Sequence, residues 1–153
     1  MAKEIRISLR GTDVPVYRDM IIPDDMIAGD LMDITTALYD WSFDAERAIA
    51  DSAGIIDMDE YVRDHMDGLC VSYRENLWIA DVTVKGEKDG DAPMVTGYNW
   101  RYIGDEFEGP EDFNKMNADA SDAALPGHYD ALRKFAELPR FDPVEFNDWL
   151  KSC

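Results

Sequence analysis

The spacing of apolar residues changes sharply within the first forty positions, and this change narrows the possible folds more than any other feature. Over residues 3–10, apolar and polar side chains alternate, as they do in a strand with one buried face. The alternation resumes over 14–22, where Pro15 restricts the strand to a sheet edge or to the strand's own start. Over about 28–40, apolar residues recur every three or four positions, which predicts an amphipathic helix. The chain is therefore expected to open strand, strand, helix.

The rest of the chain predicts further helices and strands. Periodicity and end signals place helices at about 43–53 and 57–68, and strands at 69–73, 77–84 and 94–103. The C-terminal third is predicted to be helical, with Tyr129, Leu132 and Phe135 on a core face and a last helix that begins at Asp142. We therefore predict an α+β fold with a ubiquitin-like ββα opening, a small mixed sheet with helices packed on one side, and a single domain over residues 1–153.

The chain carries a large excess of negative charge. Asp and Glu together number 33 against 15 Lys and Arg, which gives a net charge of −18 at pH 7. Phosphate backbones bind basic surfaces and anionic membranes attract basic segments, so this balance argues against direct binding to nucleic acid or to a membrane. The excess is also far above the ~2–8 charges that keep a small domain soluble. A charged partner is expected to be basic.

Few residues are suited to metal, cofactor or covalent chemistry. Cys70 and Cys153 have no CxxC neighbour, and His65 and His128 are the two histidines, so neither a structural zinc site nor histidine-based catalysis is expected. Phosphate-binding glycine loops and HExxH do not occur in the sequence. No apolar run reaches the ~18 residues of a membrane span, and residues 1–5 show no signal-peptide core. We expect a non-enzymatic protein without metal or cofactor in a reducing cytoplasm.

An acidic row is predicted along the helix at 57–68. At ~100° per residue, four carboxylates fall on one side of this helix and four apolar residues on the other. The acidic side holds Asp57, Glu60, Asp64 and Asp67, and the apolar side holds Met58, Val62, Met66 and Leu69. The row spaces its charges by about 4.5–6 Å along the helix, comparable with the spacing of phosphates in DNA, where one strand carries one charge per ~3.4 Å of the duplex axis. It predicts either a solvated helix face or a surface that binds a basic partner.

A second acidic run and a group of aromatic residues are the other candidate binding residues. The run consists of Asp105, Glu106, Glu108, Glu111 and Asp112. Its carboxylates are expected to steer a basic partner, although oxygen ligands of this kind also suit a hard cation. Tyr98, Trp100 and Tyr102 would share one strand face and anchor the partner, because aromatic residues carry much of the energy of protein interfaces. The alternative for these residues is packing in the core, which we expect for Trp41 and Trp78.

Both ends of the chain carry motifs that resemble one known family in the same order. The N-terminal matches are Leu9-Arg10-Gly11, Val14-Pro15-Val16-Tyr17-Arg18, Ile22-Pro23-Asp24-Asp25 and Tyr39-Asp40-Trp41. The C-terminal matches are Gly109-Pro110-Glu111-Asp112-Phe113, Pro126-Gly127-His128-Tyr129 and Phe141-Asp142-Pro143-Val144-Glu145-Phe146. In these segments the sequence resembles the plasmid pRiA4b Orf-three-like family. The resemblance implies an α+β fold with a ubiquitin-like opening and an origin in a mobile genetic element.

The middle of the chain departs from that family. Members usually carry a His-Leu-His segment after the tryptophan, where this chain has Ser42-Phe43-Asp44-Ala45-Glu46. Of the family's Tyr-Asp-Phe-Gly-Asp-x-Trp-x-His stretch, this chain keeps Tyr73 and Trp78 alone, and Gly104-Asp105-Glu106-Phe107 replaces a Cys-Pro-Pro-Glu-Asp stretch. Any site that those histidines and acids form in the family is therefore missing from this chain, and the resemblance implies no reaction.

Charge and resemblance together lead to one expected function and several rivals. We expect a phage- or plasmid-borne, non-enzymatic inhibitor of the anti-CRISPR or antirestriction type, whose acidic surface mimics DNA. Its partner would be a basic, nucleic-acid-binding complex in the host cytoplasm. The rivals are an acidic protein-interaction module with another role, a housekeeping protein whose surface is adapted to high salt, and an enzyme or metal-dependent module that uses the run at 104–112.

Overall fold

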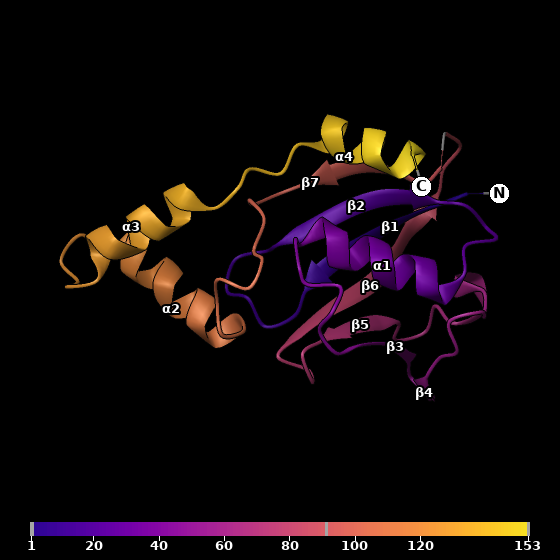
Figure 1. The fold of residues 1–153 in the computed structure, drawn as a ribbon, viewed down its shortest axis with the longest axis horizontal. Helices are drawn as coiled ribbons and strands as arrows, with labels where there is room; N and C mark the ends of the chain where they lie inside the picture. Colours follow the sequence, from indigo (N-terminus) through magenta and orange to yellow (C-terminus); the bar gives the residue numbers. More distant parts are fainter. Residues whose placement is uncertain (1, 91, 153) are drawn as a thin grey trace.

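The fold is described from a computed structural model that covers residues 2–90 and 92–152, so Cys153 lies outside the described residues. Its elements, in chain order, are β1 (Lys3–Leu9), β2 (Tyr17–Ile22), α1 (Ala28–Leu38), β3 (Arg47–Asp51), β4 (Gly54–Ile55), the 3₁₀ turn η1 (Val62–Asp64), β5 (Cys70–Tyr73), β6 (Trp78–Glu87), β7 (Met94–Tyr98), α2 (Pro110–Ser121), α3 (His128–Glu137) and α4 (Pro143–Lys151). Figure 1 shows one sheet with α1 across it, α4 beside β7, and α2 and α3 beyond the end of the sheet. The predicted α+β fold is confirmed.

Seven strands form one sheet in the order β4-β3-β5-β6-β1-β2-β7. Every pairing between these strands is antiparallel, so the sheet is not the mixed one that the sequence led us to expect. β1 lies inside the sheet, where Ile5 stands opposite Met20 of β2 and Val84 of β6. The hairpin and α1 occur where the two periodicities predict them, which confirms the strand, strand, helix opening.

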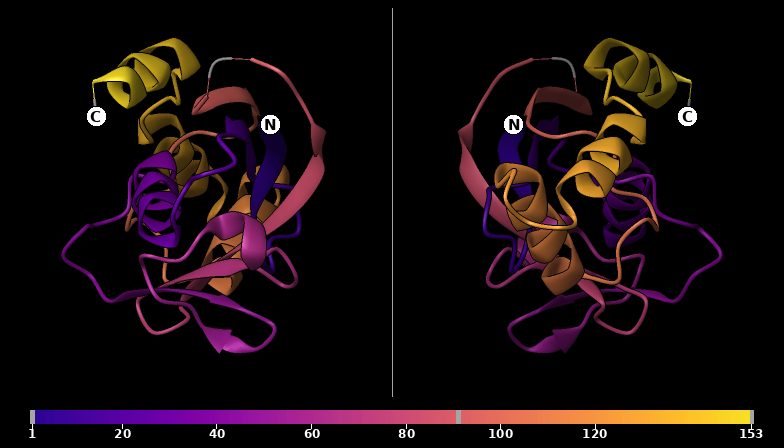
Figure 2. Two further views of the ribbon diagram at one scale, coloured as in Figure 1. Left: turned by 90° about the vertical axis from the view of Figure 1, so that its right-hand side faces the viewer. Right: turned by 90° about the vertical axis from the view of Figure 1, so that its left-hand side faces the viewer.

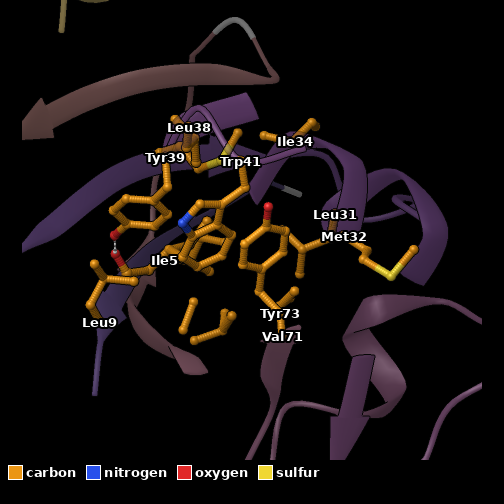
Figure 3. Packing of buried hydrophobic residues seen from close by; sticks show 14 of the residues in the cluster. Ile5, Leu9, Leu31, Met32, Ile34, Leu38, Tyr39, Trp41, Val71 and Tyr73 are labelled. Carbon is orange, nitrogen blue, oxygen red and sulfur yellow. Dashed lines mark hydrogen bonds between the residues drawn. The ribbon is translucent and has the colours of Figure 1, made fainter. Parts of the chain in front are cut away.

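The apolar face of α1 packs against one side of the sheet, and Figure 3 shows this core. Leu31 and Leu38 are fully buried there. Beyond the end of α1, the Trp41 ring stacks on the Tyr73 ring with 4.6 Å between centroids. Trp41 and Trp78 are 3% and 1% exposed, so their predicted place in the core is confirmed. One cluster of buried side chains runs through the strands, α1 and α4.

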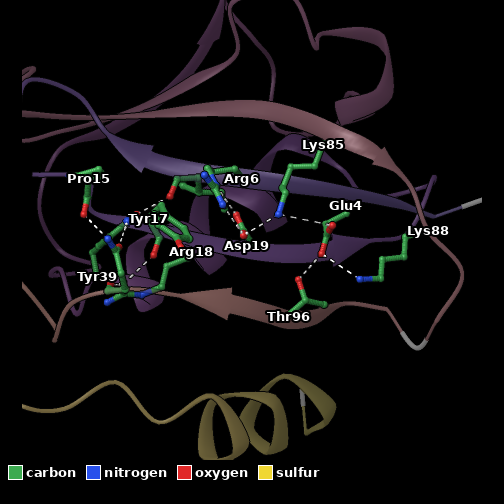
Figure 4. Close-up of polar contacts among 12 residues, drawn as sticks. Glu4, Arg6, Pro15, Tyr17, Arg18, Asp19, Tyr39, Lys85, Lys88 and Thr96 are labelled. Atoms are coloured by element: carbon green, nitrogen blue, oxygen red, sulfur yellow. Dashed lines mark hydrogen bonds and ion pairs between the residues drawn. The ribbon is translucent and has the colours of Figure 1, made fainter.

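No helix of the described chain covers the opposite side of the sheet (Figure 2), and charged side chains lie on it. Its centre is a network of ion pairs, drawn in Figure 4, in which Asp19 lies 2.8 Å from Arg6 and 3.0 Å from Lys85. Burial acts to raise the pKa of Asp19, but hydrogen bonds from these two cations outweigh it and lower the pKa. Glu4 pairs with Lys88 at 3.5 Å and with Lys85 at 3.8 Å. Three of the chain's few cations are therefore bound to carboxylates on this face.

The helix predicted over 43–53 is wrong, because part of this segment is the strand β3. β3 pairs with β5 along most of its length, and Ile49 is fully buried. Pairing within a sheet outweighs the modest helical preference of this short segment, which contains four alanines. Gly54, which was expected to end the helix, begins β4 with a φ of +131°.

The helix predicted over 57–68 is also wrong, because the segment contains just the short turn η1. Its internal backbone hydrogen bonds are those of short turns, such as Asp64 N–H to the carbonyl oxygen of Tyr61, and two of its carbonyl oxygens bond to the start of α1. The carbonyl oxygen of Glu60 accepts from the N–H of Ala28 at 2.8 Å, and that of Met58 accepts from the N–H of Gly29 at 2.9 Å. These N–H groups belong to the first turn of a helix, where intrahelical partners are missing, and the residue before α1 offers no side-chain cap. The segment therefore caps α1 through its backbone.

β7 is shorter than the strand predicted over 94–103. It ends at Tyr98, and two residues later Trp100 has a φ of +66°, which extended strands do not adopt. The chain therefore turns before Tyr102, and the three aromatic residues of this segment do not share one strand face.

The C-terminal third is helical, as predicted, but the expected core face of α3 is only partly correct. Phe135 packs against the core, whereas Tyr129 is 72% exposed and Leu132 is 43% exposed. Ala131, which stands between these two residues in the sequence, is fully buried. α3 packs against α2, where the Phe135 ring lies 6.0 Å from the Phe113 ring of α2.

α4 begins at the predicted cap and closes part of one edge of the sheet. The Asp142 side chain accepts hydrogen bonds from the first turn of α4, and Pro143 occupies the first helical position. Further along, the Asn147 side chain accepts from the N–H of Val95 on β7 at 2.7 Å and donates to its carbonyl oxygen at 3.2 Å. An open edge strand offers such backbone groups to other strands. At Val95, the side chain of Asn147 binds these backbone groups, where another strand would otherwise pair.

Candidate partner-binding groove

Two acidic segments, 23–33 and 51–67, lie together around the start of α1. They are joined by the backbone hydrogen bonds that cap α1 and by an ion pair of 3.3 Å between Arg63 and Asp24. Their carboxylates are those of Asp24, Asp25, Asp30, Asp33, Asp51, Asp57, Asp59, Glu60, Asp64 and Asp67. Arg63 is the one lysine or arginine within the two segments. We call this region the acidic end.

The predicted acidic row lies within the acidic end, but it is not a row. Its four carboxylates are all exposed: Asp57, Glu60, Asp64 and Asp67. They stand on a loop, so the regular spacing predicted from a helix is wrong. One Asp67 oxygen accepts a hydrogen bond from the Ser52 hydroxyl at 2.9 Å. What remains of the prediction is that these charges gather at one end of the molecule.

The second predicted acidic run lies at the other end of α1. The N–H of Gly104 donates to the carbonyl oxygen of Tyr39, just after α1 ends, and a helix of 11 residues is about 16 Å long. Asp105 and Asp112 accept hydrogen bonds, at 2.7 Å from the Tyr73 hydroxyl and at 2.9 Å from a backbone N–H. The remaining members are exposed: Glu106, Glu108 and Glu111. The two predicted acidic groups therefore do not form one patch.

The three predicted aromatic anchors are separated in the structure. Tyr98 is 44% exposed, whereas Trp100 and Tyr102 are partly buried against the core. Packing of Trp100 against two phenylalanine rings accounts for its position. Tyr98 and Trp100 line a cavity of about 360 Å³ together with Arg101 and Arg140, and these arginines do not suit a basic partner. Of the three residues, Tyr102 alone lines the groove described next.

A groove runs between α1 and α4, which lie side by side in Figures 1 and 2. It consists of two adjoining cavities, of about 530 Å³ and 510 Å³, whose walls share Phe43 and Trp149. Other apolar or aromatic wall residues are Met26, Ile34 and Leu150 in the first cavity and Trp41, Tyr102 and Phe146 in the second. Carboxylates line both: Asp25, Asp30 and Asp33 in the first, and Asp40 and Glu145 in the second. We call this concave surface the α1–α4 groove.

Sequence reasoning missed the groove. Phe43 fell in a segment that was wrongly predicted to be helical, and Trp149 lies on the last helix of the chain. The two residues are 49% and 40% exposed, and they share a cavity because α4 returns to α1. Asp30, Asp33 and Asp40 follow one another at steps of three and seven, which is a signal for one polar side of a helix. No signal in the sequence indicates which other helix or strand lies opposite this side of α1.

Most carboxylates of the α1–α4 groove form no ion pair with a lysine or arginine of the described chain. Asp33 pairs with Arg47 at 2.8 Å. Within the described chain, no lysine or arginine forms an ion pair with the other four: Asp25, Asp30, Asp40 and Glu145. Burial raises the pKa of Asp40, and the nearby carboxylate of Asp105 raises it further. Arg140 is the one cation among the groove-lining residues. The groove therefore combines apolar surface with uncompensated negative charge.

His65 connects two carboxylates within the acidic end. Its Nδ1 lies 2.8 Å from Asp51 of β3, and its Nε2 lies 3.2 Å from Glu60. The hydrogen bond with Asp51 raises the pKa of His65, and the same bond lowers the pKa of Asp51. A protonated His65 therefore forms ion pairs that connect this part of the acidic end to the sheet.

This contact is expected to make stability depend on pH. Because the pKa of His65 is higher in the folded chain than in the unfolded chain, the protonated imidazole stabilises the fold fully below the ordinary histidine pKa of about 6.5. The contribution is lost as the pH rises through the raised value. In urea denaturation, the difference in free energy of unfolding between the protein and His65→Gln should therefore be larger at about pH 5.5 than at about pH 9. An equal difference at both pH values would contradict a role for the charge.

Among residues 2–90 and 92–152, no helix is long and apolar enough to cross a membrane. In the same part of the chain, no three or more His, Cys, Asp and Glu side chains are grouped so that they could hold a metal ion. Both histidines have structural contacts, since Nδ1 of His128 lies 3.0 Å from the backbone oxygen of Asp119.

Comparison with known proteins adds information on the fold. The sequence matches no known protein family and no curated protein. A protein of unknown function from Methanosarcina mazei Go1 has a similar solved structure, with a TM-score of 0.73 at 15% identity over 94% of this chain and 96% of that chain. At this identity the similarity shows a shared fold alone. The resemblance to the plasmid pRiA4b Orf-three-like family stays a prediction.

Proposed function

We propose that this protein is a non-enzymatic inhibitor that binds a basic, nucleic-acid-binding protein in the place of nucleic acid. The observation that carries the proposal is the acidic end, where ten carboxylates and one arginine adjoin a groove with exposed aromatic side chains. An anionic surface attracts a basic surface before contact and orients it. It also competes for the lysine and arginine side chains that would otherwise neutralise phosphates.

The distribution of cations supports a directed surface over an even coat of charge. On the open side of the sheet, Arg6, Lys85 and Lys88 pair with carboxylates. At the acidic end, Arg63 pairs with one carboxylate and Arg47 of the adjoining strand β3 pairs with another, and most of the other carboxylates have no lysine or arginine partner among the described residues. A surface adapted to high salt would carry its excess everywhere, so this gathering favours a binding role.

The proposed setting follows from the mobile-element origin that the family resemblance implies. Phages and plasmids benefit from small proteins that disable restriction or CRISPR complexes, and these complexes hold DNA or RNA on basic surfaces. We therefore propose an inhibitor of the anti-CRISPR or antirestriction type that acts in the host cytoplasm.

Affinity capture from a bacterial lysate tests this function. The comparison is between the protein and a variant with Asp57→Asn, Asp59→Asn and Asp64→Asn. These side chains are exposed and form no ion pair with a lysine or arginine of the described chain, so the fold is expected to persist. The protein should retain a nucleic-acid-binding partner that is free of nucleic acid, and the variant should retain about tenfold less of it.

A second variant makes the same change in net charge elsewhere: Glu75→Gln, Glu87→Gln and Asp89→Asn. It should capture the partner as well as the unchanged protein does. Equal loss in both variants would mean that net charge alone drives capture, and the acidic end would not be the binding surface. A partner that binds no nucleic acid would instead identify an interaction module with another role, and the proposed inhibition would be wrong.

A further inference from the structure

We infer that the α1–α4 groove binds an amphipathic helix of the partner protein, with lysine or arginine at both ends of its apolar face. This inference rests on the proposed function and deepens it, because it assigns one kind of partner segment to one concave surface. Its basis is a pair of exposed aromatic side chains flanked on both sides by carboxylates that form no ion pair with a lysine or arginine of the described chain.

The aromatic side chains provide the apolar contact. Phe43 and Trp149 line both cavities of the groove, although each exposes two fifths or more of its surface. Each ring is supported from one side: the Arg47 guanidinium lies 5.3 Å from the Phe43 ring, and the Phe146 ring lies 5.3 Å from the Trp149 ring. Rings that are held before binding lose little conformational freedom on contact, which makes them effective anchors.

The carboxylates lie at the two ends of this apolar surface. Asp30 lines one cavity and Asp40 the other, and ten residues along α1 and its end correspond to about 15 Å. Asp25 adds a negative charge to the first end, and Glu145 adds one to the second, where Arg140 offsets one of the two carboxylates and leaves the end negative. A partner helix repeats the same distance after about three turns. Cations ten or eleven residues apart, with apolar residues on the same face between them, would therefore match the groove.

A helix fits this surface better than an added strand does. Strand addition needs a sheet edge with free backbone groups, and near the groove Asn147 already occupies both backbone groups of Val95 on β7. The two walls are helices, whose backbone groups bond internally. A helix brings its own backbone hydrogen bonds and contacts such walls through side chains alone.

Two labelled synthetic peptides test the inference by fluorescence anisotropy. Both have about 15 residues and the same leucine and lysine composition. One places leucines on a single helix face with lysines at its two ends, and the other is a scrambled order without a continuous apolar face. We expect the amphipathic peptide to bind at least about tenfold more tightly and to gain helical circular dichroism on binding.

Variants of the protein locate the contact. Phe43→Ser should weaken the amphipathic peptide about tenfold, whereas Leu132→Ser, which changes an exposed apolar residue of α3 outside the groove, should not. The double variant Asp30→Asn, Asp40→Asn removes charge without removing packing. It should weaken binding several-fold and reduce its dependence on salt. Asparagine tolerates the φ of +54° at position 40, so this variant is expected to fold.

Equal affinity for the two peptides would overturn the inference, and so would binding that is unchanged in both the Phe43 variant and the double variant. Either result leaves the capture experiment as a valid test of the proposed function, because that experiment uses carboxylates outside the groove walls. If the peptides behave as expected but capture shows no dependence on the acidic end, the groove assignment stands and the proposed function is wrong.

Discussion

Replacing Arg18 with methionine is expected to lower the free energy of unfolding by about 3–5 kcal/mol. Arg18 is fully buried, and its guanidinium donates to four backbone carbonyl oxygens. Nε bonds to Leu38 at 3.3 Å, Nη1 to Tyr17 at 3.1 Å and to Asn99, and Nη2 to Arg101 at 3.3 Å. These carbonyls come from β2, from the end of α1 and from the segment after β7. Methionine fills a similar volume but leaves all four acceptors without this donor.

Aromatic rings take the place of a counter-ion for this buried charge. The guanidinium carbon lies 4.3 Å from the centre of the Phe141 ring and 5.0 Å from that of Tyr39, and no carboxylate of the described chain pairs with Arg18. Burial lowers the pKa of Arg18, but a guanidinium is not deprotonated in proteins, so the group stays charged. Arg18 therefore connects the sheet, α1 and the C-terminal segment, and it belongs to one of the motifs that carry the family resemblance.

Urea denaturation of matched variants measures this effect. Arg18→Lys keeps the charge but loses the planar guanidinium and its fixed set of N–H donors, so it should destabilise the protein by about 2 kcal/mol or more. Arg10→Met removes an arginine in the turn after β1 that is bound to Asp81 of β6 with both partners partly exposed, and it should cost about 1 kcal/mol or less. Loss of similar stability in the Arg10 and Arg18 variants would contradict the structural role of the buried guanidinium.

The elements that local sequence controls were predictable. The β1–β2 hairpin, α1, β5 and β6 follow from alternating and helical spacing, and α4 follows from its cap at Asp142. Segments 43–53 and 57–68 were mispredicted because their backbones bond to distant parts of the chain, β5 in one case and the start of α1 in the other. Helical propensity and capping patterns describe a segment alone, and tertiary hydrogen bonds overrode them here.

The candidate site was predictable in chemistry but not in shape. The excess of carboxylates and its meaning for a basic partner could be derived from composition, and the acidic end contains the four carboxylates first singled out. The α1–α4 groove could not be derived, because Phe43 and Trp149 are 106 positions apart in the sequence and line the same cavities through the packing of α4. The aromatic residues that the sequence favoured, Tyr98 and Trp100, proved to border a cavity with two arginines.

The second large effect is expected in competition with nucleic acid. If the acidic end occupies the surface on which a partner holds DNA or RNA, both cannot be bound at once. Neutralising Asp57, Asp59 and Asp64 removes three exposed charges, each of which contributes about 0.5–1 kcal/mol to an interaction of this kind. The concentration that displaces half of the nucleic acid should therefore rise about 10- to 100-fold. The variant at Glu75, Glu87 and Asp89 should displace as well as the unchanged protein.

The most direct measurement is a titration of this protein into a complex of the captured partner with labelled duplex DNA, or with labelled RNA where the partner binds RNA. We predict release of the labelled nucleic acid at about one protein per binding site. The concentration needed for half of this release should rise when the three carboxylates are neutralised, as given above. A ternary complex, in which the partner holds the nucleic acid and this protein together, would contradict the account.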